Sequence, residues 1–417
     1  MSEGVDTVGL DSPPRLAVDR LLDDRQTRII VCCGAGGVGK TTTAAALGVR
    51  AAARGRKAVV LTIDPARRLA QSMGIDSLDN TPRRVADAGE DGGELHAMML
   101  DMKRTFDEIV EAHADAERAR AILANPFYQS LSAGFAGTQE YMAMEKLGQL
   151  RARDDWDLII VDTPPSRSAL DFLDAPKRLG SFLDGKFIRV LMAPAKVGGR
   201  AGMKFLNVGM SMMTGTLSKL MGASLLKDVQ TFVAAMDTMF GGFRTRADAT
   251  FRLLQAPGTA FLVVAAPEPD ALREAAYFVE RLAAERMPLA GLVLNRVHGS
   301  GADQLSAERA LAAAENLEEG GIVDQESGKA GLRDTAAEPP GADDDTTAVD
   351  RITAGLLRLH AERMQVIARE QRTRDRFTSL HPEVAVAEVA ALPGDVHDLA
   401  GLRAIGERLA AGVPAGA

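Results

Sequence analysis

Residues 29–43 read Ile29-Ile30-Val31-Cys32-Cys33-Gly34-Ala35-Gly36-Gly37-Val38-Gly39-Lys40-Thr41-Thr42-Thr43. An apolar run typical of a buried strand leads into the pattern Gly-x4-Gly-Lys-Thr, and a helix-forming run follows it. Glycines in such a turn let successive backbone N–H groups converge on an anion, and the helix N-terminus adds about half a positive charge. The stretch therefore predicts a phosphate-binding loop between a strand and a helix of an α/β fold.

The loop predicts ATP and Mg2+ as cofactors. Lys40 would neutralise the β- and γ-phosphates, and the hydroxyl of Thr41 would bind the metal. The residues that we expect around the nucleotide here are Gly34, Gly36, Gly37, Val38, Gly39, Lys40, Thr41 and Thr42.

The composition indicates a large soluble protein of more than one part. A chain of 417 residues exceeds the size at which single cores stop growing. The net charge of −8 argues against nucleic acid as a partner. The N-terminus is acidic without an apolar signal region, and no uninterrupted apolar stretch of about eighteen residues occurs. We therefore expect a cytoplasmic protein, with the periphery of a membrane as an alternative location.

Strand-like runs recur along the chain with helical patterns between most of them. They lie at 28–33, 57–63, 94–100, 157–161, 260–266, 289–294 and 384–392. This alternation predicts a doubly wound, mostly parallel sheet that binds its ligand at the carboxyl ends of the strands. We divide the chain into a polar leader (1–26), an ATPase core (27–184 and 256–298), an inserted helical subdomain (185–255), an acidic insertion (299–350) and a C-terminal part of the core (351–417).

The segment 185–254 has no convincing strand and carries eight of the 17 methionines. Methionine side chains are flexible, so a Met-rich helical surface can adapt to a hydrophobic client or a membrane protein. The same residues could equally fill the core of a helical lobe. A basic rim on this lobe favours an acidic partner or anionic lipid, although such a rim is more often a solvated surface.

The segment 299–350 is acidic, with thirteen acidic and three basic residues from Gly301 to Asp350. Residues 303–317 could form a helix. We expect the rest to be a mobile insertion, because it cannot bury enough apolar area to offset the entropy of ordering it.

Two aspartates at strand ends complete the nucleotide site. Asp162 follows the apolar run 159–161, as expected of a carboxylate that holds a water of Mg2+. Asp64 follows the run 59–63, and it could orient and deprotonate the attacking water. Cys32 and Cys33 are adjacent on a strand and point to opposite faces, so we interpret them as small buried side chains rather than as a metal site.

The order of these motifs resembles the arsenical-pump and tail-anchored-protein-targeting ATPases, a family of dimerising ATPases with a deviant phosphate loop. The resemblance rests on the loop, on Asp64-Pro65-Ala66 and on the run from Asp162 to Leu173. It implies that Asp64 is the catalytic acid and that Asp162 opens the second switch. It also matches Glu268 to a glutamate near the nucleotide, Asn295 to the asparagine that reads adenine, and Pro393 to a loop that packs on adenine.

This chain departs from the family pattern in its loop and in its cysteines. The family carries a signature lysine immediately before Gly-Gly that reaches the partner's phosphates, and here that position is Ala35. A charge acting in trans can be worth about 10^3 to 10^5 in rate. The cysteines that hold zinc or arsenite in family members are absent, so we expect neither site.

Three functions follow from these patterns. The first is a dimeric ATP-hydrolysing switch, either a homodimer or a heterodimer with a paralogue that carries the signature lysine, which moves the Met-rich lobe. The second is the energising subunit of an anion or metalloid efflux pump. The third is a regulatory subunit that binds ATP and hydrolyses it slowly. The observation that suggests it is Ala35 in place of the signature lysine.

Overall fold

The computed structural model describes residues 13–63, 68–89, 92–126, 128–129, 132, 138–164, 245–318 and 343–411. Asp64 lies outside the described residues. So does the Met-rich segment, apart from residues 245–254, which belong to a helix. Within the segment 299–350, residues 319–342 are also outside.

An eight-stranded sheet in the order β3-β4-β2-β5-β1-β6-β7-β8 forms the centre of the molecule. All neighbours pair in parallel except β3 with β4. The strands are β1 (Ile29–Cys33), β2 (Lys57–Thr62), β3 (Arg83–Arg84), β4 (Glu94–Met99), β5 (Leu158–Asp162), β6 (Thr259–Ala265), β7 (Leu289–Val297) and β8 (Val386–Ala390). The predicted parallel sheet is thus confirmed, with each expected strand present to within a few residues. The short β3 has no apolar run, and sequence analysis did not predict it.

Helices cover both faces of the sheet, as a doubly wound fold requires. The core divides into two layers because alternate residues of a strand point to opposite faces. Ile29 and Val31 pack into one layer and Ile30 and Cys32 into the other. The Ile30 layer is covered by α1 (Val18–Asp23), α2 (Lys40–Ala53), α3 (Arg68–Ser72) and α15 (Leu399–Ala411), and the Ile29 layer by α7 (Thr138–Arg153) and α12 (Pro269–Ala284).

The second half of the predicted leader is part of this core. Arg15 pairs with Val386 of β8, and Leu22 of α1 is fully buried. Arg56 is also buried, and its guanidinium donates hydrogen bonds to the carbonyls of Leu22 and Thr27 at 2.9 and 2.8 Å. Burial lowers the pKa of Arg56, but backbone carbonyls satisfy much of its donor capacity.

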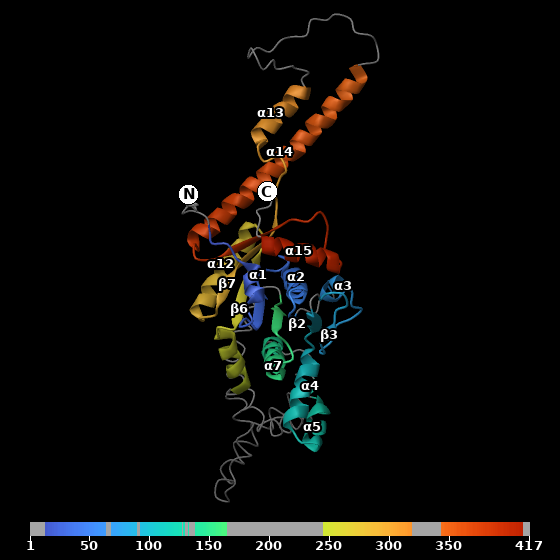
Figure 1. Ribbon diagram of the computed structural model, residues 1–417, viewed down its shortest axis with the longest axis vertical. Helices are drawn as coiled ribbons and strands as arrows, with labels where there is room; N and C mark the ends of the chain where they lie inside the picture. Colours follow the sequence, from blue (N-terminus) through green and yellow to red (C-terminus); the bar gives the residue numbers. More distant parts are fainter. Residues whose placement is uncertain are drawn as a thin grey trace, which may run out of the picture.

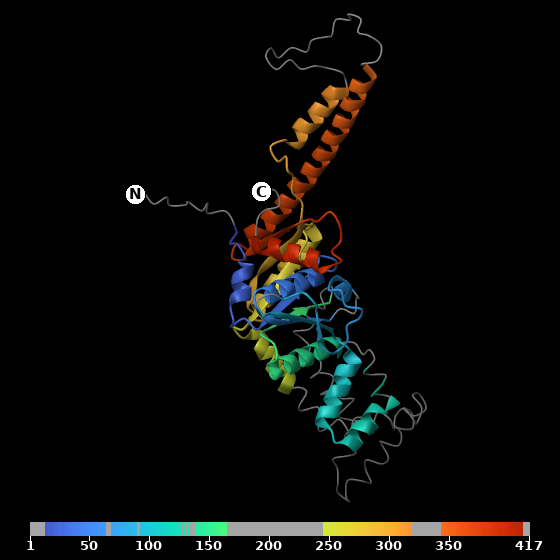
Figure 2. The same ribbon diagram turned by 45° about the vertical axis from the view of Figure 1, so that its right-hand side comes forward.

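Two helical pairs extend from opposite ends of the sheet (Figures 1 and 2). The arm consists of α13 (Ala307–Glu318) and α14 (Asp343–Leu380), which lie side by side. α14 ends on the sheet, where Phe377 is buried in the core. At the other end lie α4 (Met102–His113) and α5 (Ala116–Leu123). Of the helices that the structure describes, none is long and apolar enough to cross a membrane.

Candidate functional site

The loop between β1 and α2 has the backbone that its glycines predict. Gly39 adopts φ 95° at the start of α2, in the left-handed region that favours glycine. A Cβ on Gly39 would lie 2.2 Å from Nδ2 of Asn295, and one on Gly34 would lie 2.0 Å from the carbonyl oxygen of Val264. Any side chain at these two positions would therefore clash with β6 or β7, so the glycines allow the loop to sit against its neighbours.

Lys40 is the first residue of α2 and is 6% exposed. Its Nζ donates a hydrogen bond of 2.6 Å to the carbonyl of Ala35. The lysine therefore folds back across the loop, and its charge lies over the concave side of the turn. A cation held in this way can bind an anion there without a large rearrangement.

Asp162 is the centre of the site and is fully buried at the end of β5. Its Oδ2 accepts hydrogen bonds from Oγ1 of Thr41 at 2.7 Å and from Oγ1 of Thr62 at 2.9 Å. We call these three residues the Asp162 cluster. Hydroxyl and carboxylate oxygens are ligands that Mg2+ prefers, so the donor set fits that metal.

Sequence analysis predicted Asp162 and Thr41 but missed Thr62. Thr62 ends β2, which is the neighbour of β5 in the sheet. A threonine that ends an apolar strand is a weak signal, because β-branched residues are common throughout strands. Only the order of the strands brings Thr62 next to Asp162.

The two cysteines of β1 are buried beside the site. Burial, and then the charge of Asp162, raises the pKa of the Cys32 thiol. Burial raises the pKa of Cys33 to about 12. Both thiols are therefore protonated at neutral pH, and protonated thiols are poor metal ligands.

Asn295 contacts the loop from β7. Its Nδ2 donates a hydrogen bond of 2.8 Å to the carbonyl of Val38, across 257 positions of sequence. The next residue, Arg296, adopts φ 62° where the pairing of β7 with β8 shifts register. A non-glycine residue in the left-handed region is uncommon, and here it accommodates the bulge that follows Asn295.

Glu268 lies beside the loop at the start of α12. It lines a cavity of about 350 Å3 together with Ala35 and Arg296. Pro393 lies in the exposed turn after β8. Both residues are thus at the carboxyl edge of the sheet, but the structure brings only Glu268 into a cavity with the loop.

Asp64 lies outside the described residues, but its neighbour Ile63 is held at the site. The N–H of Ile63 donates to the carbonyl of Asp162 at 3.0 Å. The carbonyl of Ile63 accepts from Nε2 of Gln139, near the start of α7, also at 3.0 Å. The chain that leads to Asp64 is therefore tied both to the Asp162 cluster and to α7.

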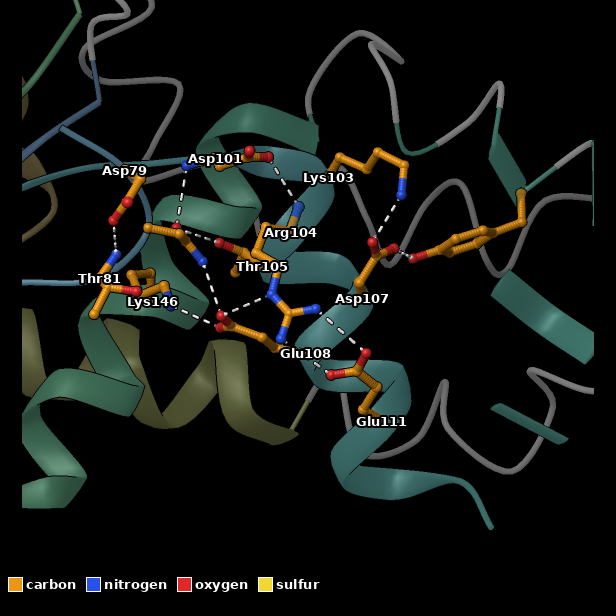
Figure 3. Close-up of polar contacts among 12 residues, drawn as sticks. Asp79, Thr81, Asp101, Lys103, Arg104, Thr105, Asp107, Glu108, Glu111 and Lys146 are labelled. Carbon is orange, nitrogen blue, oxygen red and sulfur yellow. Dashed lines mark hydrogen bonds and ion pairs between the residues drawn. The ribbon is translucent and has the colours of Figure 1, made fainter. Parts of the chain in front are cut away.

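A second polar cluster, not predicted from the sequence, joins α7 to α4 (Figure 3). Glu108 accepts from Nζ of Lys146 at 2.7 Å, and the side chain of Lys146 is only 6% exposed. Asn80 bonds to the other oxygen of Glu108 at 3.2 Å and accepts from Thr105 at 3.1 Å. These contacts fix α4 against the sheet.

A neighbouring pair joins α7 to the helix that begins at residue 245. Nε of Arg246 lies 2.8 Å from Oε1 of Glu145, whose side chain is 5% exposed. Tyr141 also donates to Glu145, at 3.2 Å. Burial, and then the charge of Glu145, raises the pKa of Tyr141. These residues line or adjoin a cavity of about 690 Å3 between α4, α7 and the helix at 245.

The chain matches a protein family described as "Anion-transporting ATPase" over residues 27–319. It is 30% identical to "ATPase GET3" of Malassezia globosa over 173 residues, which cover 42% of this chain and 49% of that protein. It is 26% identical to "ATPase GET3" of Podospora anserina over 299 residues, 70% of this chain and 80% of that protein. It is 28% identical over 205 residues to a "Putative arsenical pump-driving ATPase" of Halobacterium salinarum, 46% of this chain and 31% of that protein. The chain thus spans about half the length of the first of these relatives.

Proposed function

The chain belongs to the family of anion-transporting ATPases, and we propose that it binds MgATP and hydrolyses it as a nucleotide-dependent switch. The observation that carries the proposal is the Asp162 cluster next to Lys40. A buried carboxylate bonded to the hydroxyl of Thr41, at the mouth of a glycine-rich loop, is an arrangement for holding a metal beside phosphates.

In this proposal, the loop binds the phosphates and Lys40 balances their charge. Lys40 exchanges its bond to the Ala35 carbonyl, 2.6 Å in this structure, for phosphate oxygens. Thr41 would hold Mg2+ directly and Asp162 would hold it through a water. When bound there, the metal would supply positive charge that offsets the charge developing on the transferred phosphoryl group.

We assign water activation to Asp64. It directly follows Ile63 in the sequence, and the backbone of Ile63 bonds to Asp162. A general base at this position accepts the proton of the attacking water, which is worth about 10^2 to 10^4 in rate. Lys40 stabilises the product phosphate.

We assign the adenine to the side of the loop where Asn295 lies. One amide hydrogen of Asn295 bonds to the carbonyl of Val38 at 2.8 Å. The second amide hydrogen and Oδ1 therefore remain to bond to the edge of the adenine ring. Pro393 would pack on the base, and Glu268 would lie near the nucleotide across the cavity beside Ala35.

The contacts of α7 supply a route from the nucleotide to the Met-rich segment 185–254. Gln139, the second residue of α7, bonds to the carbonyl of Ile63, and the same helix carries Glu145 and Lys146. Arg246, which bonds to Glu145, lies in the described end of that segment. A shift of Ile63 on hydrolysis would therefore move α7 and the base of the segment, to which we assign a hydrophobic client or membrane protein.

The proposal includes a dimer that closes over the nucleotide. With Ala35 in place of the signature lysine, a homodimer lacks the charge acting in trans. A paralogue with a lysine at this position would supply that charge in a heterodimer. Ala35 is 9% exposed and lines the 350 Å3 cavity, which leaves room for a longer side chain at this face.

Turnover measurements on the purified chain test these assignments. The wild-type chain should bind MgATP and hydrolyse it slowly, and Ala35→Lys should raise turnover by about tenfold or more if the homodimer closes. Ala312→Lys, which adds the same charge on an exposed position of α13, is the control and should change nothing. Fast hydrolysis by the wild-type homodimer would show that the lysine is dispensable.

Two other functions are distinguished by the same assay. A regulatory subunit would bind ATP tightly, and its hydrolysis of ATP would stay slow even in Ala35→Lys and in the presence of the paralogue. The observation that favours this function is Ala35 in place of the signature lysine. A metalloid-pump subunit would be stimulated by arsenite. The chain has only two cysteines, and both are buried, so we expect no stimulation.

A further inference from the structure

An apolar stripe on the arm faces solvent. Val349, Ile352, Leu356 and Leu359 of α14 are 60, 65, 61 and 63% exposed. They make up most of the large exposed hydrophobic side chains in the described part of the chain. Because they recur at intervals of three and four residues, they share one face of the helix.

The stripe is not the face that holds α14 to α13. Ala354 and Ala361 of α14 are fully buried, as are Ala310 and Ala314 of α13, so small residues form the contact within the arm. At about 100° per residue, Ala354 and Ala361 point roughly opposite to the stripe. The arm therefore has a complete internal contact and a second apolar face that is uncovered.

The spacing of the residues in the stripe indicates that its partner is another helix. The intervals alternate between three and four residues, so the pattern repeats every seven residues, as in the seam of a coiled coil. The next described position in the same repeat is Arg363, which is exposed. The seam thus has an aliphatic part and a basic end.

We propose that this face of α14 pairs with the same face of a second copy of the chain, in antiparallel orientation. The intervals 3-4-3 from Val349 to Leu359 read the same in both directions, which is what a two-fold interface requires. In that pairing Val349 faces Leu359 of the second copy, and Ile352 faces Leu356. Parallel pairing would place the guanidinium groups of the two Arg363 side chains together, whereas antiparallel pairing separates these like charges.

The arm also has a recess at the basic end of the seam. A hollow of about 440 Å3 is lined by Leu359, His360 and Arg363 of α14 and by residues 300–302. Nε of Arg363 donates to the carbonyl of Gly299 at 2.7 Å, which holds the arginine in place while it stays exposed. This hollow receives Val349 of the second copy.

The contact is modest in size and separate from the nucleotide site. The seam from Val349 to Arg363 is about 21 Å long at 1.5 Å per residue. Two such helix faces bury on the order of 1,000 Å2, close to the lower limit for specific interfaces, so we expect reversible association. Antiparallel arms place the two ATPase cores at opposite ends, so this contact differs from closure of a dimer over ATP.

Cysteine cross-linking of the full chain tests the orientation. The native cysteines should contribute little background cross-linking, because Cys32 and Cys33 are 0 and 1% exposed. A mixture of Ile352→Cys and Leu356→Cys protomers should form a disulfide-linked dimer under mild oxidation. Either variant alone should not, because antiparallel pairing separates identical positions beyond disulfide reach of about 7 Å. Leu380→Cys, on the same helix and 67% exposed but off the seam, is the control.

Sedimentation of the full chain without nucleotide tests the association itself. Wild type should gain mass over roughly 1 to 100 µM, and Ile352→Glu with Leu356→Glu should lose that step while Leu380→Glu keeps it.

Cross-linking by each single variant alone would overturn the antiparallel arrangement. The glutamate substitutions could instead leave the sedimenting mass the same as in wild type, with the circular dichroism spectrum intact. That result would show that a second copy of the chain does not cover the stripe. ATP binding should be unaltered in all of these variants, so failure here is distinguishable from failure of the nucleotide site.

Discussion

The carboxyl edge of the sheet and the α13–α14 arm use opposite chemistry. At the sheet edge, the groups that matter are polar and buried: Asp162 is 0% and Lys40 6% exposed. On the arm, they are apolar and exposed, as for Ile352 at 65%. A buried polar group is costly unless it has partners, whereas an exposed aliphatic group costs the folded chain little.

This difference indicates where substitutions act. At the edge, polar groups are held in place by contacts between distant parts of the chain, so a single change there should alter ligand binding or stability. On the arm, a change should leave the fold and the nucleotide site alone and act on association.

Lys40→Ala should weaken ATP binding about 1,000-fold or more, on the order of 4 kcal/mol, because the phosphate charge would lose its nearest buried cation. Titration calorimetry measures the affinity, and circular dichroism checks the fold. Lys57→Ala removes an exposed lysine from the start of β2 and should bind ATP normally. If Lys40→Ala binds ATP with wild-type affinity, the loop is not part of the nucleotide site.

Asp64→Asn should keep ATP affinity and lower turnover by about 10^2 to 10^4, because the amide keeps the shape but cannot accept the proton. Single-turnover hydrolysis with the nucleotide pre-bound measures the step directly. If the rate is unchanged, another group activates the water.

Arg246→Met should destabilise the protein by about 2 to 4 kcal/mol, because it leaves the Glu145 carboxylate buried without its cation. The shift of the urea midpoint measures this cost. Arg151→Met is the matched control, since it removes the same group from a pair with Asp154, which is 67% exposed, and should cost less than about 1 kcal/mol. Equal costs in the two variants would mean that the Glu145 pair is not tightly buried in solution.

Leu356→Ala should change the free energy of unfolding by less than about 0.5 kcal/mol in dilute solution, because the side chain is largely in water. Leu61→Ala, at a fully buried position of β2, should cost about 2 to 5 kcal/mol. Chemical denaturation at sub-micromolar protein measures both. A large loss in Leu356→Ala would show that the monomer itself covers the stripe.

Much of the fold and part of the site could be predicted from local patterns. Mostly apolar runs indicated the seven longer strands, because buried strands of a parallel sheet carry few polar side chains, although Glu94 and His96 lie in β4 and Glu388 in β8. The loop and Asp162 were found because their residues are adjacent in sequence to those strands. Glu268 and Asn295 were assigned only through resemblance. Their contacts depend on β6 lying next to β1 and β7 next to β6, which no local pattern specifies.

The sequence by itself determined the α/β class, the phosphate loop and the carboxylate at the end of β5, because each depends on residues within about ten positions of one another. Only the tertiary structure decided that Thr62 and Thr41 meet on Asp162, that Asn295 bonds to Val38, and that Arg246 closes on Glu145. The repeat from 349 to 359 is present in the sequence, but periodicity alone does not say which face of a helix is buried. The packing of α13 on the opposite alanines left that repeat exposed, since a helix can cover only one side of its neighbour.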